Sequence, residues 1–458
     1  MAKAAKKDPA LTPEEKLAQA LVPESEQPYQ IPENWCWTKM STVAQWGSGG
    51  TPSRKHPEYY EGNIPWIKTG ELEDNYLFET EEHITEEAIS NSSAKLFPVN
   101  TIVIAMYGAT IGKVGLLGII ATTNQACACG VCSSALNFKY LFYYSRFQKD
   151  AFIRKAKGGA QPNISQDIIK NHSIPLPPLT EQQRIVDRIE SLFAKLDEAK
   201  EKAQAIVDGF EDRKAAILMN GVTGKLTEVW RNRYGFTRSD WKTVKLSEIC
   251  LLQTGIMKGK HFQTETIKMP YLRVANVQDG FLNLQEIKEI EVEKSNYERY
   301  LLKDGDVLFT EGGDFDKLGR GTVWHSEIPN CLHQNHIFVV RPQEGTVLPE
   351  YLSYQAGSQY GKKYFLSCSK QTTNLASINS TQLKNFPIMM PSIDEQKEII
   401  NIIDGLIASE QKAKEAAEQV IDQIDAMKKS ILARAFRGEL GTNDPADESA
   451  EELLKRIL

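Results

Sequence analysis

Three cysteines in the first half of the chain have a spacing that could hold a metal ion. Cys127, Cys129 and Cys132 lie within six residues of one another, and thiolates are common ligands of zinc. Small apolar residues alternate with these cysteines, which is typical of a buried strand. The pair His333-x-x-His336 could complete a metal site only if two distant parts of the chain met. We therefore expect a buried strand and no metal.

Other segments resemble catalytic motifs only in part. The segment 108–113 contains the glycines and the lysine of a phosphate-binding loop, but it is one residue short and lacks the following Ser or Thr. Pro177-Pro178 lacks the preceding Asn or Asp that an amino-methyltransferase motif requires. Glu311, Asp314 and Asp316 could bind magnesium, but they lie among basic residues and form no nuclease pattern. We expect tight turns at these places and no catalytic centre.

The composition indicates a soluble protein of a reducing compartment. The chain has 458 residues, of which 41% are hydrophobic and 25% are charged, and its net charge is −6. A protein that bound nucleic acid over its whole surface would be basic, so any such contact must be local. Seven cysteines without a disulfide-like spacing favour the cytoplasm. The length allows two or three domains.

One apolar stretch, residues 99–121, is long enough to raise the question of a membrane span. It carries Lys113 at its middle and four glycines, and it is rich in β-branched residues. This pattern favours strand–turn–strand over a membrane helix.

The chain repeats itself. Residues 169–226 match residues 383–440 at a constant offset of 214 without a gap, so that Glu181-Gln182 falls on Glu395-Gln396. Self-similarity of this extent is typical of duplicated structural units. Each copy opens with prolines that end a strand, and Thr180 and Asp394 then lie where a helix N-cap is expected.

Both copies continue as long helices with a heptad pattern. Apolar residues recur at spacings of four and three, and Arg213 and Glu410 each interrupt the pattern once. The predicted pairing positions are Ile185, Ile189, Leu192, Leu196, Ile206, Phe210, Ile217, Ile399, Ile403, Leu406, Val420, Ile424 and Ile431. We expect the two helices to pair antiparallel with each other, and the alternative is that each pairs with another chain. At about 1.5 Å per residue such a helix extends on the order of 50 Å and acts as a spacer.

The segments before the two helices are related more loosely. Apolar positions are shared, as in 64–68 and 269–273, while the polar residues between them differ. Two domains with one scaffold and different surfaces are what two different targets would require. The termini also match weakly, at 8–10 and 444–446, which predicts that the C-terminal tail lies near the N-terminus.

Together these features resemble the specificity (S) subunit of type I restriction–modification systems. The residues that carry the resemblance are Gly49-Gly50-Thr51-Pro52-Ser53, Ile64-Pro65-Trp66-Ile67, the run from Pro175 to Val186, and the run from Ile431 to Leu440. The order and duplication of these segments make the match specific. The second helix departs from the family where Pro391-Ser392 replaces a double proline.

The resemblance implies an α+β fold in which two globular α/β target recognition domains are separated by two long helices. These helices form an antiparallel coiled coil, and the whole is a pseudo-twofold internal repeat. The expected boundaries are an N-terminal tail or helix (1–28), recognition domain 1 (29–179), spacer helix 1 (180–226), a linker (227–240), recognition domain 2 (241–392), spacer helix 2 (393–440) and a C-terminal tail (441–458).

The resemblance also implies the partners. Each recognition domain would read one half of a split site on double-stranded DNA, at half-sites about one DNA turn (roughly 34 Å) apart. Two methyltransferase subunits would dock on the helices and modify adenine at N6, and restriction/motor subunits would join them. This chain would bind no cofactor, because S-adenosylmethionine, ATP and magnesium would belong to the partners.

Direct reading of bases requires Arg, Lys, Asn, Gln, Ser or Thr on loops that enter a groove. We expect such residues on polar, glycine-containing loops in both domains. In the first domain they are Ser48, Gly49, Gly50, Thr51, Ser53, Arg54, Lys55, Lys68, Thr69, Tyr107, Thr110, Lys113, Asn124, Gln125, Gln161 and Asn163. In the second they are Lys258, Lys260, Arg273, Thr310, Arg320, Gln334, Asn335, Lys370, Gln371, Thr372 and Asn374.

Two alternatives stay open at this point. A coiled-coil scaffold with protein-binding ends would also need the long helices, but it gives no reason for divergent polar loops on a common framework. A specificity subunit that serves a related fused restriction enzyme would differ only in its partner.

Overall fold

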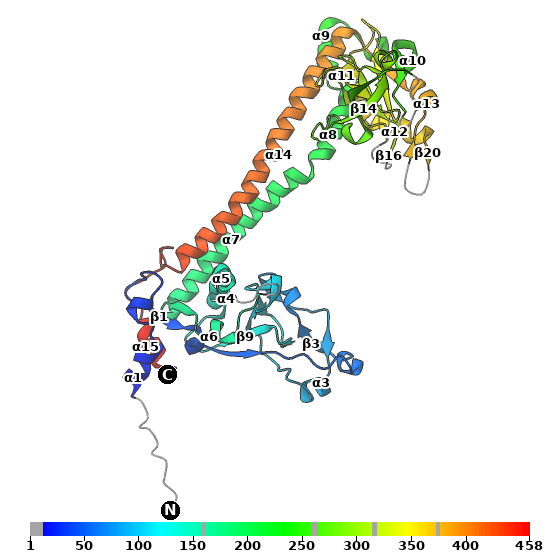
Figure 1. The fold of residues 1–458 in the computed structure, drawn as a ribbon. Coiled ribbons are helices and arrows are strands. Elements are labelled where there is room, and N and C mark those ends of the chain that lie inside the picture. The colour runs from blue at the N-terminus through cyan, green and yellow to red at the C-terminus, as the bar shows by residue number, and fades with distance from the viewer. Residues whose placement is uncertain (1–11, 157–161, 258–263, 314–317, 372–375) are drawn as a thin grey trace, which may run out of the picture. The chain divides into compact units, whose positions relative to one another are not determined.

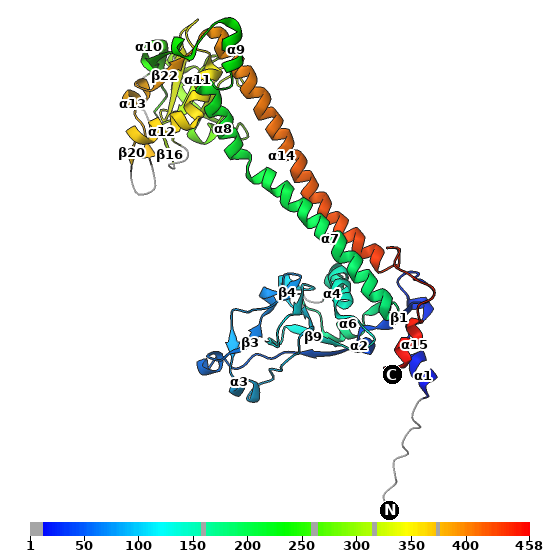
Figure 2. The ribbon, with the colours of Figure 1, turned by 180° about the vertical axis from the view of Figure 1, so that it is seen from behind.

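A computed structural model describes residues 12–156, 162–257, 264–313, 318–371 and 376–458 (Figures 1 and 2). The chain divides into two compact units. The first unit comprises Met1–Lys202 with Val420–Leu458, and the second comprises Ala203–Gln419. Each recognition segment thus shares a unit with the start of the helix that follows it and with the end of the other long helix.

The described part of the first unit is built on a five-stranded sheet. Its order is β2 (Ala44–Ser48), β9 (Cys127–Cys132), β6 (Ile102–Ala105), β7 (Val114–Leu117) and β4 (Asn75–Leu77). A second sheet has the order β5 (His83–Ile84), β3 (Ile64–Ile67) and β8 (Thr122–Thr123), and β1 (Cys36–Lys39) pairs with β10 (Ser173–Leu176). The helices are α1 (Pro13–Ala20), α2 (Met40–Val43), α3 (Glu86–Ser90), α4 (Phe138–Phe147), α5 (Lys149–Lys155) and α6 (Gln166–Lys170).

The apolar stretch 99–121 forms the centre of this sheet, as its β-branched residues predict. Strands β6 and β7 pair antiparallel, and all of their residues are buried. Gly112 turns the chain between them at φ +74°, a conformation that favours glycine. Strand β9 pairs with β6 and buries Cys127 and Cys129, so the predicted buried strand is confirmed.

The second unit repeats this plan with variations. One described sheet has the order β12 (Cys250–Thr254), β19 (Ile337–Pro342), β15 (Val307–Thr310) and β17 (Gly321–Val323). A second has the order β14 (Lys288–Glu293), β13 (Thr266–Leu272) and β18 (Leu332–His333). A third has the order β16 (Gly312–Gly313), β21 (Ala376–Ser377) and β20 (Lys370–Gln371). Strand β11 (Lys242–Lys245) pairs with β22 (Pro387–Met390), as β1 pairs with β10. The helices are α10 (Leu246–Ile249), α11 (Pro349–Gly357), α12 (Gln359–Cys368) and α13 (Ser380–Lys384).

The two long helices differ from each other and from the predicted bounds. The first is broken into α7 (Leu179–Asp208) and α8 (Phe210–Val222), whereas α14 (Ile393–Ala435) is continuous. The break lies at Gly209, and the Arg213 guanidinium donates 2.7 Å to the Ile206 carbonyl that the break leaves without a helical partner. Glycine is among the least favourable helix residues, and this one has Gln423 as its counterpart in α14.

Each long helix begins earlier than expected, so that its N-cap lies two residues before the predicted one, at Pro178 and at Ser392. Thr180 lies inside α7, where its hydroxyl donates 2.8 Å to Asp447. Asp394 lies inside α14, and the hydroxyl of Ser392 instead accepts the backbone N–H of Glu395 at 3.3 Å. The proline before each helix therefore leads directly into the first turn.

Within each unit the long helices run in opposite directions. In the first unit Asp197 pairs with Lys428, and Lys200 lies 2.9 Å from Asp425. In the second unit Arg213 lies 2.6 Å from Glu410. The two polar interruptions of the heptad pattern therefore pair with each other.

The predicted pairing positions are only partly buried. Ile185, Ile189, Phe210, Ile399, Ile403 and Ile424 are buried, and Leu192, Leu196, Ile217 and Ile431 are half-buried. Ile206, Leu406 and Val420 are about 40% exposed, at 41%, 39% and 41%, and their role as pairing positions stays a prediction. A pair of helices covers each such residue on one side only, and no described neighbour covers the other side.

The tails and the linker are structured. The linker 227–240 contains α9 (Glu228–Tyr234), and the C-terminal tail contains α15 (Ala450–Lys455). Helices α1 and α15 lie side by side in both views (Figures 1 and 2), and the Lys16 ammonium donates 2.8 Å to the Leu458 carbonyl. The prediction that the C-terminal tail lies near the N-terminal segment is confirmed.

The repeated Glu-Gln pair anchors each long helix to its own unit. The Gln182 amide oxygen accepts the Asn137 N–H at 2.7 Å, and its amide nitrogen donates to the Ala135 and Pro177 carbonyls at 3.0 Å. Gln396 makes the matching bonds to Leu348, Thr346 and Pro391, at 2.9, 3.4 and 3.2 Å. Both glutamines are completely buried.

Replacing Gln182 with Ala should lower the free energy of unfolding by about 2–4 kcal/mol, because buried backbone groups would lose their hydrogen bonds. Gln183→Ala, at the exposed neighbouring position, should change it by no more than about 0.5 kcal/mol. Urea denaturation of the full chain, followed by circular dichroism, measures both. Equal effects of the two substitutions would show that the buried amide is not an anchor.

Candidate nucleic-acid interface

The predicted DNA-reading segments of the first unit meet at one place. The Gly50 N–H donates 2.9 Å to the Thr123 carbonyl, and the Asn124 N–H donates 3.0 Å to the Ile67 carbonyl. Farther along, the Met106 N–H donates 2.9 Å to the Ala126 carbonyl. Tyr107 forms an isolated bridge with Asn163. Loops from five separate parts of the sequence thus form one continuous surface region, which we call loop cluster 1 (48–55, 67–69, 106–113, 123–126 and 162–164).

The second unit builds the same cluster with the same backbone bonds. The Ile256 N–H donates 2.9 Å to the His333 carbonyl, as Gly50 does to Thr123. The Gln334 N–H donates 2.9 Å to the Leu272 carbonyl, as Asn124 does to Ile67. The Ile378 N–H donates a hydrogen bond of 2.8 Å to the Glu311 carbonyl. The matching bond of the first unit runs from the Ile164 N–H to the Met106 carbonyl, at 2.9 Å. We call this region loop cluster 2 (254–257, 272–274, 310–313, 320, 333–336 and 376–378).

The glycines of cluster 1 lie where loops of the same domain pack closely. Gly49 and Gly50 are buried, and a Cβ on either would overlap the backbone of Thr123 or of Ser93 and Ala94. In cluster 2 a Cβ on Gly255 would likewise overlap the His333 and Gln334 carbonyls. These glycines let neighbouring loops of the same domain approach one another, and so they determine the shape of the surface.

Basic and acidic side chains are paired on cluster 1. Glu82 receives the Arg54 guanidinium at 2.7 Å and the Lys68 ammonium at 2.9 Å. Lys68 also lies 3.2 Å from Glu81, and Arg54 stacks over the Tyr60 ring with its guanidinium carbon 3.9 Å from the ring centre. Two of the predicted DNA-binding side chains are therefore held in place by carboxylates that the sequence reasoning missed.

These ion pairs act on protonation in the expected directions. The hydrogen bond to Glu82 raises the pKa of Lys68 above its usual range. Burial opposes ionisation of Glu82, but the hydrogen bonds and charges of Lys68 and Arg54 outweigh it and lower the pKa of this carboxyl. Both groups are therefore charged at neutral pH, and of the two only the Lys68 ammonium can attract a polyanion.

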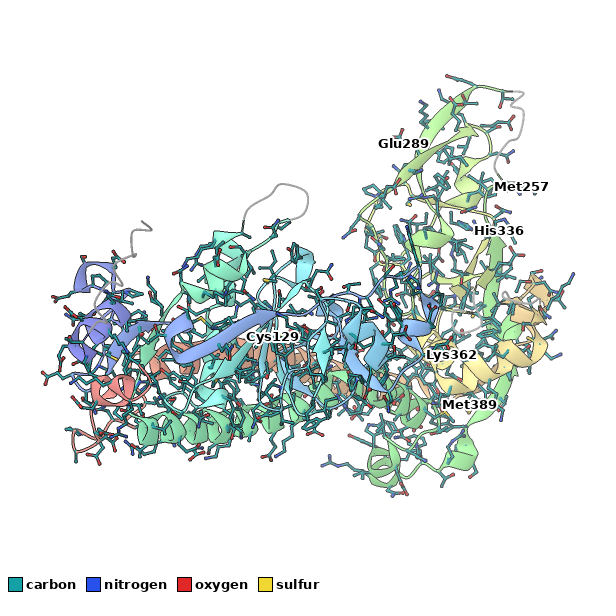
Figure 3. All side chains as sticks on the ribbon, turned by 90° about the horizontal axis from the view of Figure 1, so that it is seen from below. Cys129, Met257, Glu289, His336, Lys362 and Met389 are labelled. Carbon is teal, nitrogen blue, oxygen red and sulfur yellow. The ribbon has the colours of Figure 1, made fainter. Side chains whose placement is uncertain are left out.

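Cluster 2 has its own set of paired side chains. Arg273 lies 3.4 Å from the Glu286 carboxylate, and the Arg320 guanidinium donates 3.1 Å to the Gln278 amide oxygen. His336 lies 2.5 Å from Glu311. Figure 3 labels His336 and Met257 in this unit, where Met257 is 60% exposed. Position 257 matches Thr51 of cluster 1, so equivalent places differ in chemistry.

The predicted residues differ in how accessible they are. Thr51, Ser53, Arg54, Lys55, Tyr107, Gln125, Asn163 and Lys370 are exposed, and Ser48, Lys68, Thr69, Thr110, Lys113, Asn124, Arg273, Arg320, Gln334 and Asn335 are half-buried. Gly49, Gly50 and Thr310 are buried. Gln161, Lys258, Lys260, Thr372 and Asn374 lie outside the described residues, and Gln371 is described only as part of strand β20.

The cysteines are buried or half-buried. Among the residues that the structure describes, no group of three or more Cys, His, Asp and Glu side chains is arranged to hold a metal ion. Burial raises the pKa of Cys129, which Figure 3 labels, to about 12, so its thiol is protonated at neutral pH. Across the same described ranges no helix combines the length and the apolar character that a membrane span requires.

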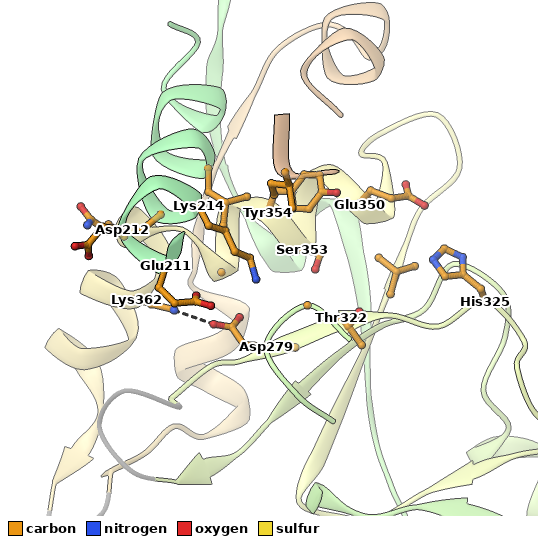
Figure 4. A pocket seen from close by; sticks show the side chains of 18 residues that line it. Glu211, Asp212, Lys214, Asp279, Thr322, His325, Glu350, Ser353, Tyr354 and Lys362 are labelled. Carbon is orange, nitrogen blue, oxygen red and sulfur yellow. Dashed lines mark hydrogen bonds and ion pairs between the residues drawn. The ribbon is translucent and has the colours of Figure 1, made fainter. Parts of the chain in front are cut away.

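A cavity of about 520 Å³ in the second unit borders cluster 2 at Gly321, the residue after Arg320 (Figure 4). It is lined by α8, α11 and the 279–280 turn, where Lys362 donates 2.9 Å to Asp279. None of the predicted DNA-binding residues lines it. Groove recognition requires surface loops, and the exposed members of the clusters meet this requirement.

The comparisons with known proteins agree with this arrangement. The family model for the type I restriction modification DNA specificity domain matches residues 32–206 and again 238–420. The EcoKI specificity subunit of Escherichia coli is 26% identical over 451 residues, which are 93% of this chain and 96% of that protein. The StySPI specificity subunit of Salmonella potsdam is 24% identical over 447 residues, 93% of this chain and 96% of that protein.

Solved structures share the fold. The HsdS subunit from Thermoanaerobacter tengcongensis superposes with a TM-score of 0.61 at 19% identity, over 91% of this chain and all of that one. A chain from a structure of complex assembly in the type I R-M system superposes with a TM-score of 0.64 at 20% sequence identity, over 90% of this chain and all of that one. Because the family model matches both halves of the sequence, this chain belongs to the specificity subunits of type I restriction–modification systems.

Proposed function

We propose that this subunit reads a split DNA target, with loop cluster 1 on one half-site and loop cluster 2 on the other. The observation that supports this proposal is one backbone framework that occurs twice and carries different side chains. Thr51 corresponds to Met257, and Met106 corresponds to Glu311. Base edges are distinguished by the pattern of donors, acceptors and methyl groups, so divergent side chains on a constant frame select different sequences.

The long helices would set the distance between the half-sites. The ion pairs Asp197–Lys428 in the first unit and Arg213–Glu410 in the second each join helices that run antiparallel, which supports antiparallel pairing of the long helices. Helix α14 has 43 residues, and at about 1.5 Å per residue this corresponds to about 64 Å. A spacer of that order is sufficient for half-sites one DNA turn apart, roughly 34 Å.

The exposed apolar positions of the helices would receive the methyltransferase subunits. Leu406, Val420 and Met427 lie at heptad-related positions of α14 and so share one face of that helix, where they are between 39% and 49% exposed. Exposed apolar residues grouped on a helix are typical of a partner interface. We propose that two methyltransferase subunits dock there, that restriction/motor subunits join the complex in the cytoplasm, and that adenine N6 is the atom modified.

In this proposal the subunit itself is not catalytic. S-adenosylmethionine, ATP and magnesium would be bound by the partner subunits, and the target adenine would be flipped into the methyltransferase. This chain would supply only the position on the DNA.

Deleting the gene from its source cell should remove N6-methyladenine from one split motif and leave every other motif unchanged. Long-read methylation sequencing of cells with and without the gene measures this, and supplies both half-sites together. A plasmid copy of the gene should restore the methylation. Persistence of every adenine-methylation motif, in cells shown to express the gene before deletion, would contradict the proposal.

Removing one heptad from each helix should shorten the spacer and keep both half-sites. Residues 196–202 and 423–429 face each other in the antiparallel register, so their joint deletion preserves the pairing of what remains. The loss is about 10 Å of helix, or about three base pairs. A charge-swapped Lys200→Asp, Asp425→Lys variant keeps the length and serves as the control. If sequencing showed the wild-type spacer in the deletion variant, the helices would not be the ruler.

A further inference from the structure

Among the cluster residues that the structure describes in both domains, two equivalent positions carry a basic residue in each. The first is Lys68 in cluster 1 and Arg273 in cluster 2. Each directly follows a strand, β3 or β13, and each precedes a short 3-10 turn, Thr69–Glu71 or Val274–Asn276. The backbone N–H of each donates 2.8 Å to the third residue of that turn, Glu71 or Asn276. The local structures are the same although the neighbouring side chains differ.

The second shared position is Lys113 in cluster 1 and Arg320 in cluster 2. Each follows a glycine with positive φ, Gly112 at +74° or Gly319 at +67°. The Lys113 carbonyl accepts the Ala105 N–H at 3.0 Å, and the Arg320 carbonyl accepts the Thr310 N–H at 3.1 Å. All four basic side chains are half-buried on the loop clusters.

The basic character is retained where other cluster positions have diverged. Residues that read two different half-sites must differ, because each base pair presents its own pattern of donors and acceptors. The phosphate backbone is the same in both half-sites, so contacts to it need no change between domains. We infer that Lys68, Arg273, Lys113 and Arg320 bind DNA phosphates at equivalent places in the two half-sites, and that base reading belongs to the diverged positions. This inference rests on the proposed function.

The carboxylate partners are also repeated. Glu81 follows Lys68 by thirteen residues and lies 3.2 Å from it, and Glu286 follows Arg273 by the same spacing and lies 3.4 Å from it. Both carboxylates are well exposed, at 77% and 70% of the side chain. Exposed ion pairs contribute little to stability, so a phosphate can replace Glu81 or Glu286 at small cost, while Glu82 continues to hold Lys68. The carboxylate keeps the basic side chain over the cluster until DNA arrives.

The test uses the full chain in complex with its methyltransferase, and it measures binding to a duplex with the methylated motif and to an unrelated duplex over a series of KCl concentrations. Lys68→Gln, Arg273→Gln, Lys113→Gln and Arg320→Gln should each reduce the slope of log K against log salt by about 0.9. Each substitution should weaken binding to both duplexes by the same factor, so that the ratio of the two affinities is unchanged. The motif methylated in cells should also stay the same. Lys268→Gln, an exposed change on β13 outside the cluster, should alter none of these.

The pair Arg273 and Glu286 separates a phosphate contact from a structural ion pair. If the pair only supports the fold, Arg273→Gln and Glu286→Gln will weaken binding alike. We expect Arg273→Gln to weaken binding and Glu286→Gln to maintain or strengthen it. Loss of one specified base from the methylated motif in Arg273→Gln would overturn the inference in favour of base reading. A wild-type complex that bound both duplexes equally would refute the proposed function instead, and the salt slopes on the unrelated duplex would still decide the phosphate contacts.

Discussion

The attachment of each domain to its long helix depends on a carboxylate that is buried away from water. Glu181 is fully buried and Glu395 is 2% exposed. A buried carboxylate is costly unless hydrogen bonds or an opposite charge replace its water. Trp35 donates 2.7 Å to Glu181 from the segment before β1, and Trp241 donates 2.9 Å to Glu395 from the segment before β11. The tryptophan thereby links the start of each domain to the first turn of the helix that leaves it.

The two carboxylates are satisfied by different means. In the second unit the Arg231 guanidinium lies 2.6 Å from Glu395, and Thr227 donates to the same oxygen at 2.8 Å. In the first unit Asn443 donates 2.8 Å and Thr442 donates 3.3 Å to Glu181, so neutral donors take the place of the cation. In both units these donors come from the segment that follows the end of the other long helix. Helix end, domain and helix start are therefore held by one polar centre.

Much of this organisation could be predicted from the sequence because it is repeated there. Glu181-Gln182 recurs at the constant offset because both copies bond the first turn of a long helix to the domain before it. The cluster loops lie side by side because the two domains share one apolar framework. The break at Gly209 was not predicted, because one glycine opposes a helix by only about 1 kcal/mol and the Arg213 contact that stabilises the break is tertiary. Glu82 and Glu286 were missed for a similar reason. The neighbouring sequence does not distinguish a glutamate that pairs with a cluster lysine or arginine from any other glutamate.

The way in which the first unit is closed has a consequence for the order of events during synthesis. The second unit is a single stretch of chain, Ala203–Gln419, so all of its parts are present once that stretch has left the ribosome. The first unit needs Val420–Leu458 as well, including the two donors to Glu181. After the first recognition domain has been synthesised, more than two hundred further residues must be translated before Thr442 and Asn443 exist. During that time Glu181 lacks these two hydrogen-bond donors. The domain that is made first is the one that is finished last.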